Sequence, residues 1–238
     1  MKSVSCVGLW VFLCALASGC GKSATTGSMV ELDHPEFLFS LPDGGSREWL
    51  GPIHDALMAD RQRITGHLQV SAMPKITVSV WAGSAEFYDA MQGNLGQVYQ
   101  GATGYLNGPR EICLLHGSRT PGEAVHEFAH AVSLALNPRF GNNPRWLWEA
   151  VAIYEAREVT DASTWPNEAK RFPGFASLNQ YDSALPYQWG YTIGRFIVTR
   201  YGDLGYVDLI RSNGDVQATL GVTESEFGSL IEAFIGRQ

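Results

Sequence analysis

The sequence has few cysteines, no excess of positive charge and only short apolar runs. Three of its four cysteines lie in the first 20 residues, so the rest of the chain, with Cys113 alone, can form no intramolecular disulfide. Lys and Arg number 17 against 24 Asp and Glu, and the net charge of −7 argues against nucleic acid as a main partner. With 238 residues, 45% hydrophobic and 17% charged, the chain is typical of one globular domain.

The N-terminal segment has the features of a targeting sequence. Lys2 precedes an eleven-residue apolar run, Val7–Ala17, which is too short to span a bilayer comfortably. The small residues that follow it before Cys20 resemble a bacterial lipoprotein signal. We therefore expect residues 1–20 to be a signal peptide, Cys20 to carry lipid in the cell envelope, and residues 21–30 to be a flexible tether. The alternative is a secreted or periplasmic protein cleaved after residue 17.

The strongest chemical signal is the segment His126-Glu127-Phe128-Ala129-His130. Side chains four residues apart lie on one face of an α-helix, so both imidazoles can reach one metal ion. The carboxylate of Glu127 then lies beside the first ring, where it can act as a general base. This arrangement is the zinc-hydrolase signature of two ligands and a base. The alternative is a pair of hydrogen-bonded core histidines.

Helix signals surround this motif. Thr120 is the expected N-cap, Pro121 the first helical residue and Glu123 the partner in a capping box, while Asn137-Pro138 should end the helix. Asn143-Pro144 predicts the start of a second, largely buried helix over residues 145–156.

Glu149 on this second helix is surrounded by apolar residues, which is costly for a carboxylate without a partner or a metal. Eighteen residues separate it from His130, so antiparallel packing of the two helices would return Glu149 to both histidines. The result is a His₂Glu site with one open position. The alternative places Glu149 at the solvent edge of an amphipathic helix.

From residue 120 to about 156 the chain resembles the gluzincin metallopeptidases of the aminopeptidase N-like branch. The gap of eighteen residues matches, as do Trp146-Leu147 before Glu149 and Tyr154 five residues after it. Pro144-Arg145-Trp146-Leu147 is similar to compact bacterial peptidase MA-like proteins. Two positions differ, because Ala150 stands where Gly is usual and Trp148 where Asn is common.

The resemblance implies one Zn²⁺ ion held by His126, His130 and Glu149, with Glu127 as general base for an attacking water. The motif by which the large aminopeptidases recognise a free N-terminus is absent, so the resemblance implies metal-dependent hydrolysis without that specificity. It also implies that a tyrosine after the ligands donates a hydrogen bond to the oxyanion, and Tyr187 and Tyr191 are the candidates. The alternative for both is packing on the helix expected over residues 186–202.

The expected fold is α+β and zincin-like. A small mixed sheet packs on the metal-binding helices in an N-terminal α/β lobe, about 31–157, and a helical lobe follows, about 158–238. Residues 92–110 are expected to form a loop. Residues 111–116 are expected to form a strand, which the resemblance makes the edge strand that pairs with an extended peptide. The expected strands cover residues 37–41, 75–81 and 111–116, and the expected helices cover 49–67, a segment from 84, 120–136, 145–156, 186–202, 215–220 and 224–234.

Two neutral imidazoles and one carboxylate suit zinc better than calcium or a soft metal. We therefore expect a zinc metallopeptidase that acts on a peptide or protein substrate. The alternatives are an inactive zinc-containing binding module, and a zinc hydrolase of a non-protein amide or of cell-wall peptide. His54, His67 and His116 are not expected to bind the metal. Cys113 is expected to be a buried structural thiol.

Overall fold

The computed structural model describes residues 30–237. The expected signal peptide, the lipidated Cys20 and all but the last residue of the expected tether lie outside this range. Within it, no helix combines the length and the apolar character that crossing a lipid bilayer requires.

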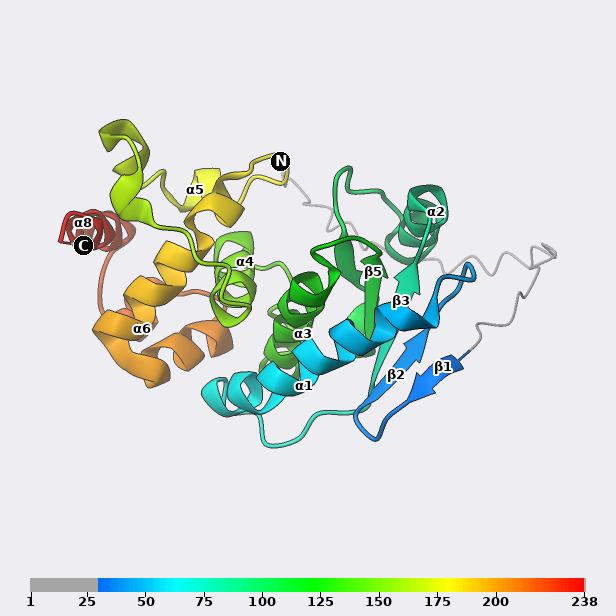
Figure 1. The fold of residues 1–238 in the computed structure, drawn as a ribbon. Coiled ribbons are helices and arrows are strands. Elements are labelled where there is room, and N and C mark those ends of the chain that lie inside the picture. Colours follow the sequence, from blue (N-terminus) through cyan, green and yellow to red (C-terminus); the bar gives the residue numbers. More distant parts are fainter. Residues whose placement is uncertain (1–29, 238) are drawn as a thin grey trace, which may run out of the picture.

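The described part of the chain is of mixed α+β type, with the strands and three helices in the first half and helices alone in the second (Figure 1). The strands are β1 (Val30–Asp33), β2 (Phe37–Ser40), β3 (Ile76–Trp81), β4 (Gly104–Leu106) and β5 (Glu111–Leu115). The helices are α1 (Leu50–His67), α2 (Ser84–Leu95), α3 (Thr120–Leu136), α4 (Arg145–Glu155), α5 (Phe175–Leu178), α6 (Leu185–Arg211), α7 (Val216–Leu220) and α8 (Glu224–Ile235).

The strands form one mixed sheet in the order β1-β2-β3-β5-β4. The three inner strands are parallel, and β1 and β4 flank them in antiparallel orientation. The expectation that residues 111–116 form the edge strand is therefore wrong. β4 covers β5, with Tyr105 opposite Cys113, and is itself the edge. Its three residues lie inside the Gly-rich segment 92–110, where no alternating pattern is long enough to separate a strand from a loop.

Alternation along β5 sends neighbouring side chains to opposite faces of the sheet. Ile112 and Leu114 pack into the main core, which also contains α1 and α3. Cys113 packs on the other face against Phe87 and Met91 of α2. The thiol is fully buried, and this burial raises its pKa, so the observed environment is that of the expected structural cysteine.

In the helical half, α4 packs closely along α6. A Cβ atom added at Gly194 would lie 3.2 Å from the carbonyl oxygen of Ala150, and one added at Gly190 would lie 3.4 Å from the Cα of Ala150. The two glycines of α6 thus let its backbone approach Ala150. Further along α6, Gly202 has a φ of 71° and interrupts the helical backbone at the residue where the sequence predicts the helix to end. The chain then continues in helical turns to Arg211.

A cluster of charged groups around the buried Glu155 joins α1 to the helical half. Glu155, at the end of α4, is fully buried and accepts a hydrogen bond of 2.9 Å from Nη1 of Arg63. Nδ1 of His67 lies 2.6 Å from the same carboxylate, and its Nε2 lies 3.3 Å from Asp203 of α6. His67 is therefore a partner of structural carboxylates. His54 contacts only the neighbouring Asp55 among the carboxylates of the described chain.

Candidate metal centre

Helix α3 starts with a different cap from the one expected. Thr120 is its first residue, and Arg119 is the N-cap, without a side-chain hydrogen bond. The hydroxyl of Thr120 instead accepts a hydrogen bond of 2.7 Å from the backbone N–H of Gly117 and donates to its carbonyl. It therefore stabilises the turn that leads out of β5, and the expected capping box with Glu123 is not formed. The motif residues lie in the middle of α3, so this difference does not move them.

Helix α4 begins at Arg145, where the helix expected over residues 145–156 starts. Pro144 is the N-cap, and its carbonyl oxygen accepts the backbone N–H of Trp148 at 3.0 Å. Glu149 follows one turn into the helix and is 4% exposed. Because α4 packs on α3, Glu149 returns to the two histidines, as the sequence predicts.

The three side chains form a buried cluster. Each of His126, His130 and Glu149 offers one ligand atom, and these atoms all lie within 4.8 Å of one another. Oε2 of Glu149 is 3.6 Å from Nε2 of His126 and 3.9 Å from Nε2 of His130. The two imidazole rings stand almost perpendicular, at 84°. Among residues 30–237, this is the cluster of histidine and acidic side chains with the geometry to hold a metal ion.

This donor set fits a divalent cation. A tetrahedral ion with bonds of about 2.0–2.1 Å separates its ligand atoms by roughly 3.3 Å, close to the distances from Oε2 of Glu149. Oε2 is also buried and has no hydrogen-bond partner in the described chain. A buried anionic oxygen is costly without a partner, and a cation between the three ligand atoms would supply one.

Two other charged residues, Glu158 and Arg145, contact His126 and Glu149 through atoms that do not face the centre of the cluster. Oε1 of Glu158 lies 2.7 Å from Nδ1 of His126, the ring nitrogen that faces away from Glu149. Arg145, one turn before Glu149, is 8% exposed and donates from Nη1 to Oε1 of Glu149 at 3.3 Å. The carboxylate of Glu149 therefore has one oxygen bound to an arginine and the other turned to the imidazoles.

The electrostatic environment differs between the two histidines. Burial lowers the pKa of His126, but the carboxylates of Glu149 and Glu158 outweigh it, and the pKa is raised well above its usual value. Burial lowers the pKa of His130 well below its usual value, and the positive charges of His126 and Arg145 add to this effect. A bound cation would compete with a proton for His126, since ligand imidazoles are neutral.

Glu127 lies between α3 and the edge strand. It is 6% exposed, and burial raises the pKa of its carboxyl group to about 8. A Cβ atom added at Gly104 of β4 would lie 3.0 Å from Oε1 of Glu127 and 3.1 Å from its Cγ. Glycine is therefore what allows the edge strand to lie against this carboxylate. A buried carboxyl group on the same helix as the two histidines of the cluster has the chemistry that a general base requires.

Of the two candidate tyrosines, only Tyr187 contacts the cluster. Its hydroxyl oxygen lies 3.4 Å from Oε1 of Glu149 and accepts a hydrogen bond of 3.2 Å from Nη2 of Arg145. Tyr187 as a whole residue is 48% exposed. Burial, as the main cause, raises the pKa of the hydroxyl to about 12, so Tyr187 remains a hydrogen-bond donor at neutral pH.

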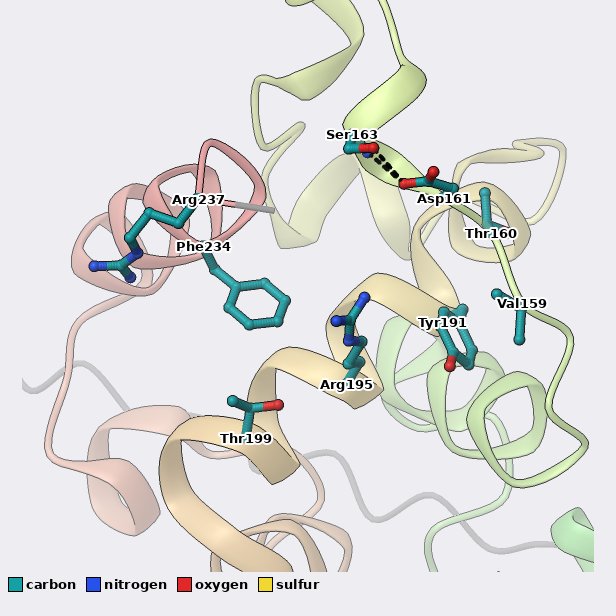
Figure 2. A pocket seen from close by; sticks show the side chains of 9 residues that line it. All are labelled: Val159, Thr160, Asp161, Ser163, Tyr191, Arg195, Thr199, Phe234 and Arg237. Atoms are coloured by element: carbon teal, nitrogen blue, oxygen red, sulfur yellow. Dashed lines mark hydrogen bonds between the residues drawn. The ribbon is translucent and has the colours of Figure 1, made fainter.

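Tyr191, one turn later on α6, lies in a different place. It packs against the ring of Tyr154 at 5.8 Å and lines a cavity of about 750 Å³ in the helical half (Figure 2). None of the three cluster residues lines this cavity, whose walls are Val159, Thr160, Asp161, Ser163, Tyr191, Arg195, Thr199, Phe234 and Arg237. The position of Tyr191 thus supports the packing alternative.

His116, at the end of β5, is also explained by packing. Its ring stacks on Trp49 with a centroid distance of 3.7 Å and an angle of 9°. It is not part of the metal-type cluster found among residues 30–237.

Several residues with a place at the site, Arg145, Glu158 and Gly104 among them, were not identified as such from the sequence. Glu158 lies nine residues after Glu149, beyond the end of α4, and no motif marks it. Gly104 lies in the segment expected to be a loop. Its only sequence signal is its position before the apolar pair Tyr105-Leu106, which is too short to predict a strand.

Comparisons of the chain with protein-family models, with curated proteins and with solved structures give no match.

Proposed function

We propose that this protein is a zinc-dependent metallopeptidase with a zincin-like catalytic domain. The observation that carries the proposal is the combination of a buried His126–His130–Glu149 cluster with a buried Glu127 on the same helix. Edge strand β4, lying against Glu127, supports a peptide as the substrate, because an extended peptide can pair with a free strand edge.

His126, His130 and Glu149 would hold the ion. When bound, Zn²⁺ acts as a Lewis acid that polarises the scissile carbonyl and lowers the pKa of water. Glu127 accepts a proton from the attacking water and passes it to the leaving amine. A carboxylate suits both steps, since it must take up the proton and then release it.

Tyr187 has a role in the same reaction. Its hydroxyl remains protonated at neutral pH and is turned toward Glu149 by Arg145. From this position it donates a hydrogen bond to the oxygen that becomes negative when water adds to the carbonyl carbon. Tyr187→Phe should therefore lower kcat more than it raises KM, because the bond is made chiefly in the transition state.

The decisive experiment compares Glu127→Gln with the parent. Zinc content is measured by elemental analysis, and cleavage is measured with a quenched peptide library, with and without a chelator. The variant should bind one equivalent of zinc and lose turnover by at least ~100-fold. Glu123→Gln, one turn earlier on α3, is the matched control and should cleave like the parent. Zinc binding without cleavage in the parent would instead favour an inactive binding module, and equal cleavage by Glu127→Gln would disprove the mechanism.

We further propose that the protein is anchored in the bacterial cell envelope through lipid on Cys20. The support is the sequence of residues 1–20 alone. Intact-mass analysis of the protein purified from membranes should give a chain that begins at Cys20 and carries acyl groups. An unmodified chain cleaved after residue 17 would contradict the anchor.

A further inference from the structure

The two imidazoles of the cluster are held in different ways. Nδ1 of His126 has a carboxylate partner, Glu158, at 2.7 Å. Nδ1 of His130 is buried and has no hydrogen-bond partner among residues 30–237. The ring of His130 lies instead flat on the indole of Trp148, with a centroid distance of 3.9 Å and an angle of 7° between the planes. One ring is thus fixed through its edge and the other through its face.

Trp148 is itself fixed from another side. The residue is 8% exposed, and the ring of Phe140 packs against its indole at 5.6 Å and 62°. Phe140 lies in the connection between α3 and α4 and is fully buried. Phe140, Trp148 and His130 therefore form a row of aromatic rings that runs from the α3–α4 connection to the cluster.

The position of Trp148 in the chain adds to its effect. It directly precedes Glu149 on α4, so the same helical turn carries one ligand and the support for another. A flat surface against an imidazole restricts rotation about the Cβ–Cγ bond, which is the rotation that would turn Nε2 away from Glu149. Aromatic stacking contributes beyond the burial of the ring area, and it needs no hydrogen-bond acceptor.

We propose that Trp148 is a positioning residue for the metal ligand His130. Trp148 holds the ring of His130 by stacking, as Glu158 holds the ring of His126 by a hydrogen bond. This inference rests on the proposed function insofar as the cluster binds zinc, but it concerns metal affinity and not cleavage. A side chain without an aromatic face at position 148 should weaken zinc binding even when the fold is retained.

The test measures the dissociation constant for Zn²⁺ by competition with a chromophoric chelator. Mutation of the hydrogen-bond partner of a metal-bound histidine typically changes metal affinity by about 10–100-fold, and stacking on Trp148 stands in for such a partner here. Trp148→Leu should therefore bind Zn²⁺ at least ~10-fold more weakly, and Trp148→Phe, which keeps a ring, within about threefold of the parent. Trp146→Leu is the matched control, because Trp146 is 2% exposed and stacks on Phe175 at 4.4 Å, away from the ligands. It should lower the melting temperature and leave zinc affinity unchanged.

A spectroscopic measurement separates positioning from general loosening of the core. The visible absorption of the Co²⁺-loaded protein reports ligand geometry, and it should change in Trp148→Leu but not in Trp146→Leu. Trp148→Met, with a flexible apolar side chain, replaces Trp148→Leu if circular dichroism shows that the latter does not fold. Parent-like affinity in a folded Leu or Met variant, or equal weakening by Trp146→Leu, would overturn the inference. Absence of zinc binding by the parent would instead overturn the proposed function.

Discussion

The contact between Glu158 and His126 gives a quantitative prediction. The 2.7 Å separation is that of a charge-assisted hydrogen bond, and such bonds contribute about 1.5–3 kcal/mol. The Glu158 side chain is 46% exposed, so water can partly replace it, and the lower end of that range applies. Glu158→Ala should therefore weaken Zn²⁺ binding by about 1.5 kcal/mol, which corresponds to about tenfold in Kd. Glu158→Gln keeps an acceptor oxygen without the charge and should lose only about threefold.

Competition with a chelator at constant pH measures this loss, and circular dichroism verifies that each variant is folded. Glu168→Ala is a suitable control, because Glu168 is an exposed acidic residue outside the metal-type cluster. It changes the net charge by the same amount and should leave Kd unchanged. Zinc binding by folded Glu158→Ala within twofold of the parent would show that the hydrogen bond does not support the ligand.

Two further predictions follow from contacts away from the ligands. Gly104→Ala places a methyl group 3.0 Å from Oε1 of Glu127 and should lower kcat by about tenfold with zinc content unchanged. Gly93→Ala is the control and should leave kcat unchanged, because its methyl group meets no atom within 4 Å. The hydrogen bond to Glu155 raises the pKa of His67 in the folded protein. The stability that His67 contributes is therefore present below pH 6.5 and is lost as the pH rises through the folded pKa. Urea unfolding should show that the difference in stability between the parent and His67→Gln decreases as the pH rises above about 6.5, and a difference that grows would contradict this sign.

The sequence predicts the helices of the site because their signals are local. Residues 126, 130 and 149 were placed by helical periodicity and by the cost of a buried carboxylate, and the structure brings them together. Proline and asparagine marked the helix ends to within one residue, although the caps differ in detail. A cap depends on which backbone groups the neighbouring turn leaves free, and the hydroxyl of Thr120 bonds the turn before α3.

The parts that sequence analysis missed depend on contacts between distant segments. β4 has three residues and becomes a strand only because β5 offers it a partner. Glu158 reaches His126 from 32 residues away, and nothing in its own neighbourhood predicts this contact. Trp148 was visible as an unusual residue, but its stacking on His130 requires the packing of α4 on α3.

The order of residues in the motif explains why the edge strand and α4 belong to one site. Neighbouring residues on an α-helix point about 100° apart, so His126 and Glu127 occupy adjoining faces of α3. His126 and His130 face α4, where Glu149 lies, and Glu127 faces Gly104 of β4. Phe128, one residue further around the helix, packs on Phe37 of the sheet. In the proposed reaction, a peptide paired with β4 would therefore reach Glu127 and the ligand cluster together, because Glu127 directly follows the cluster residue His126 on α3.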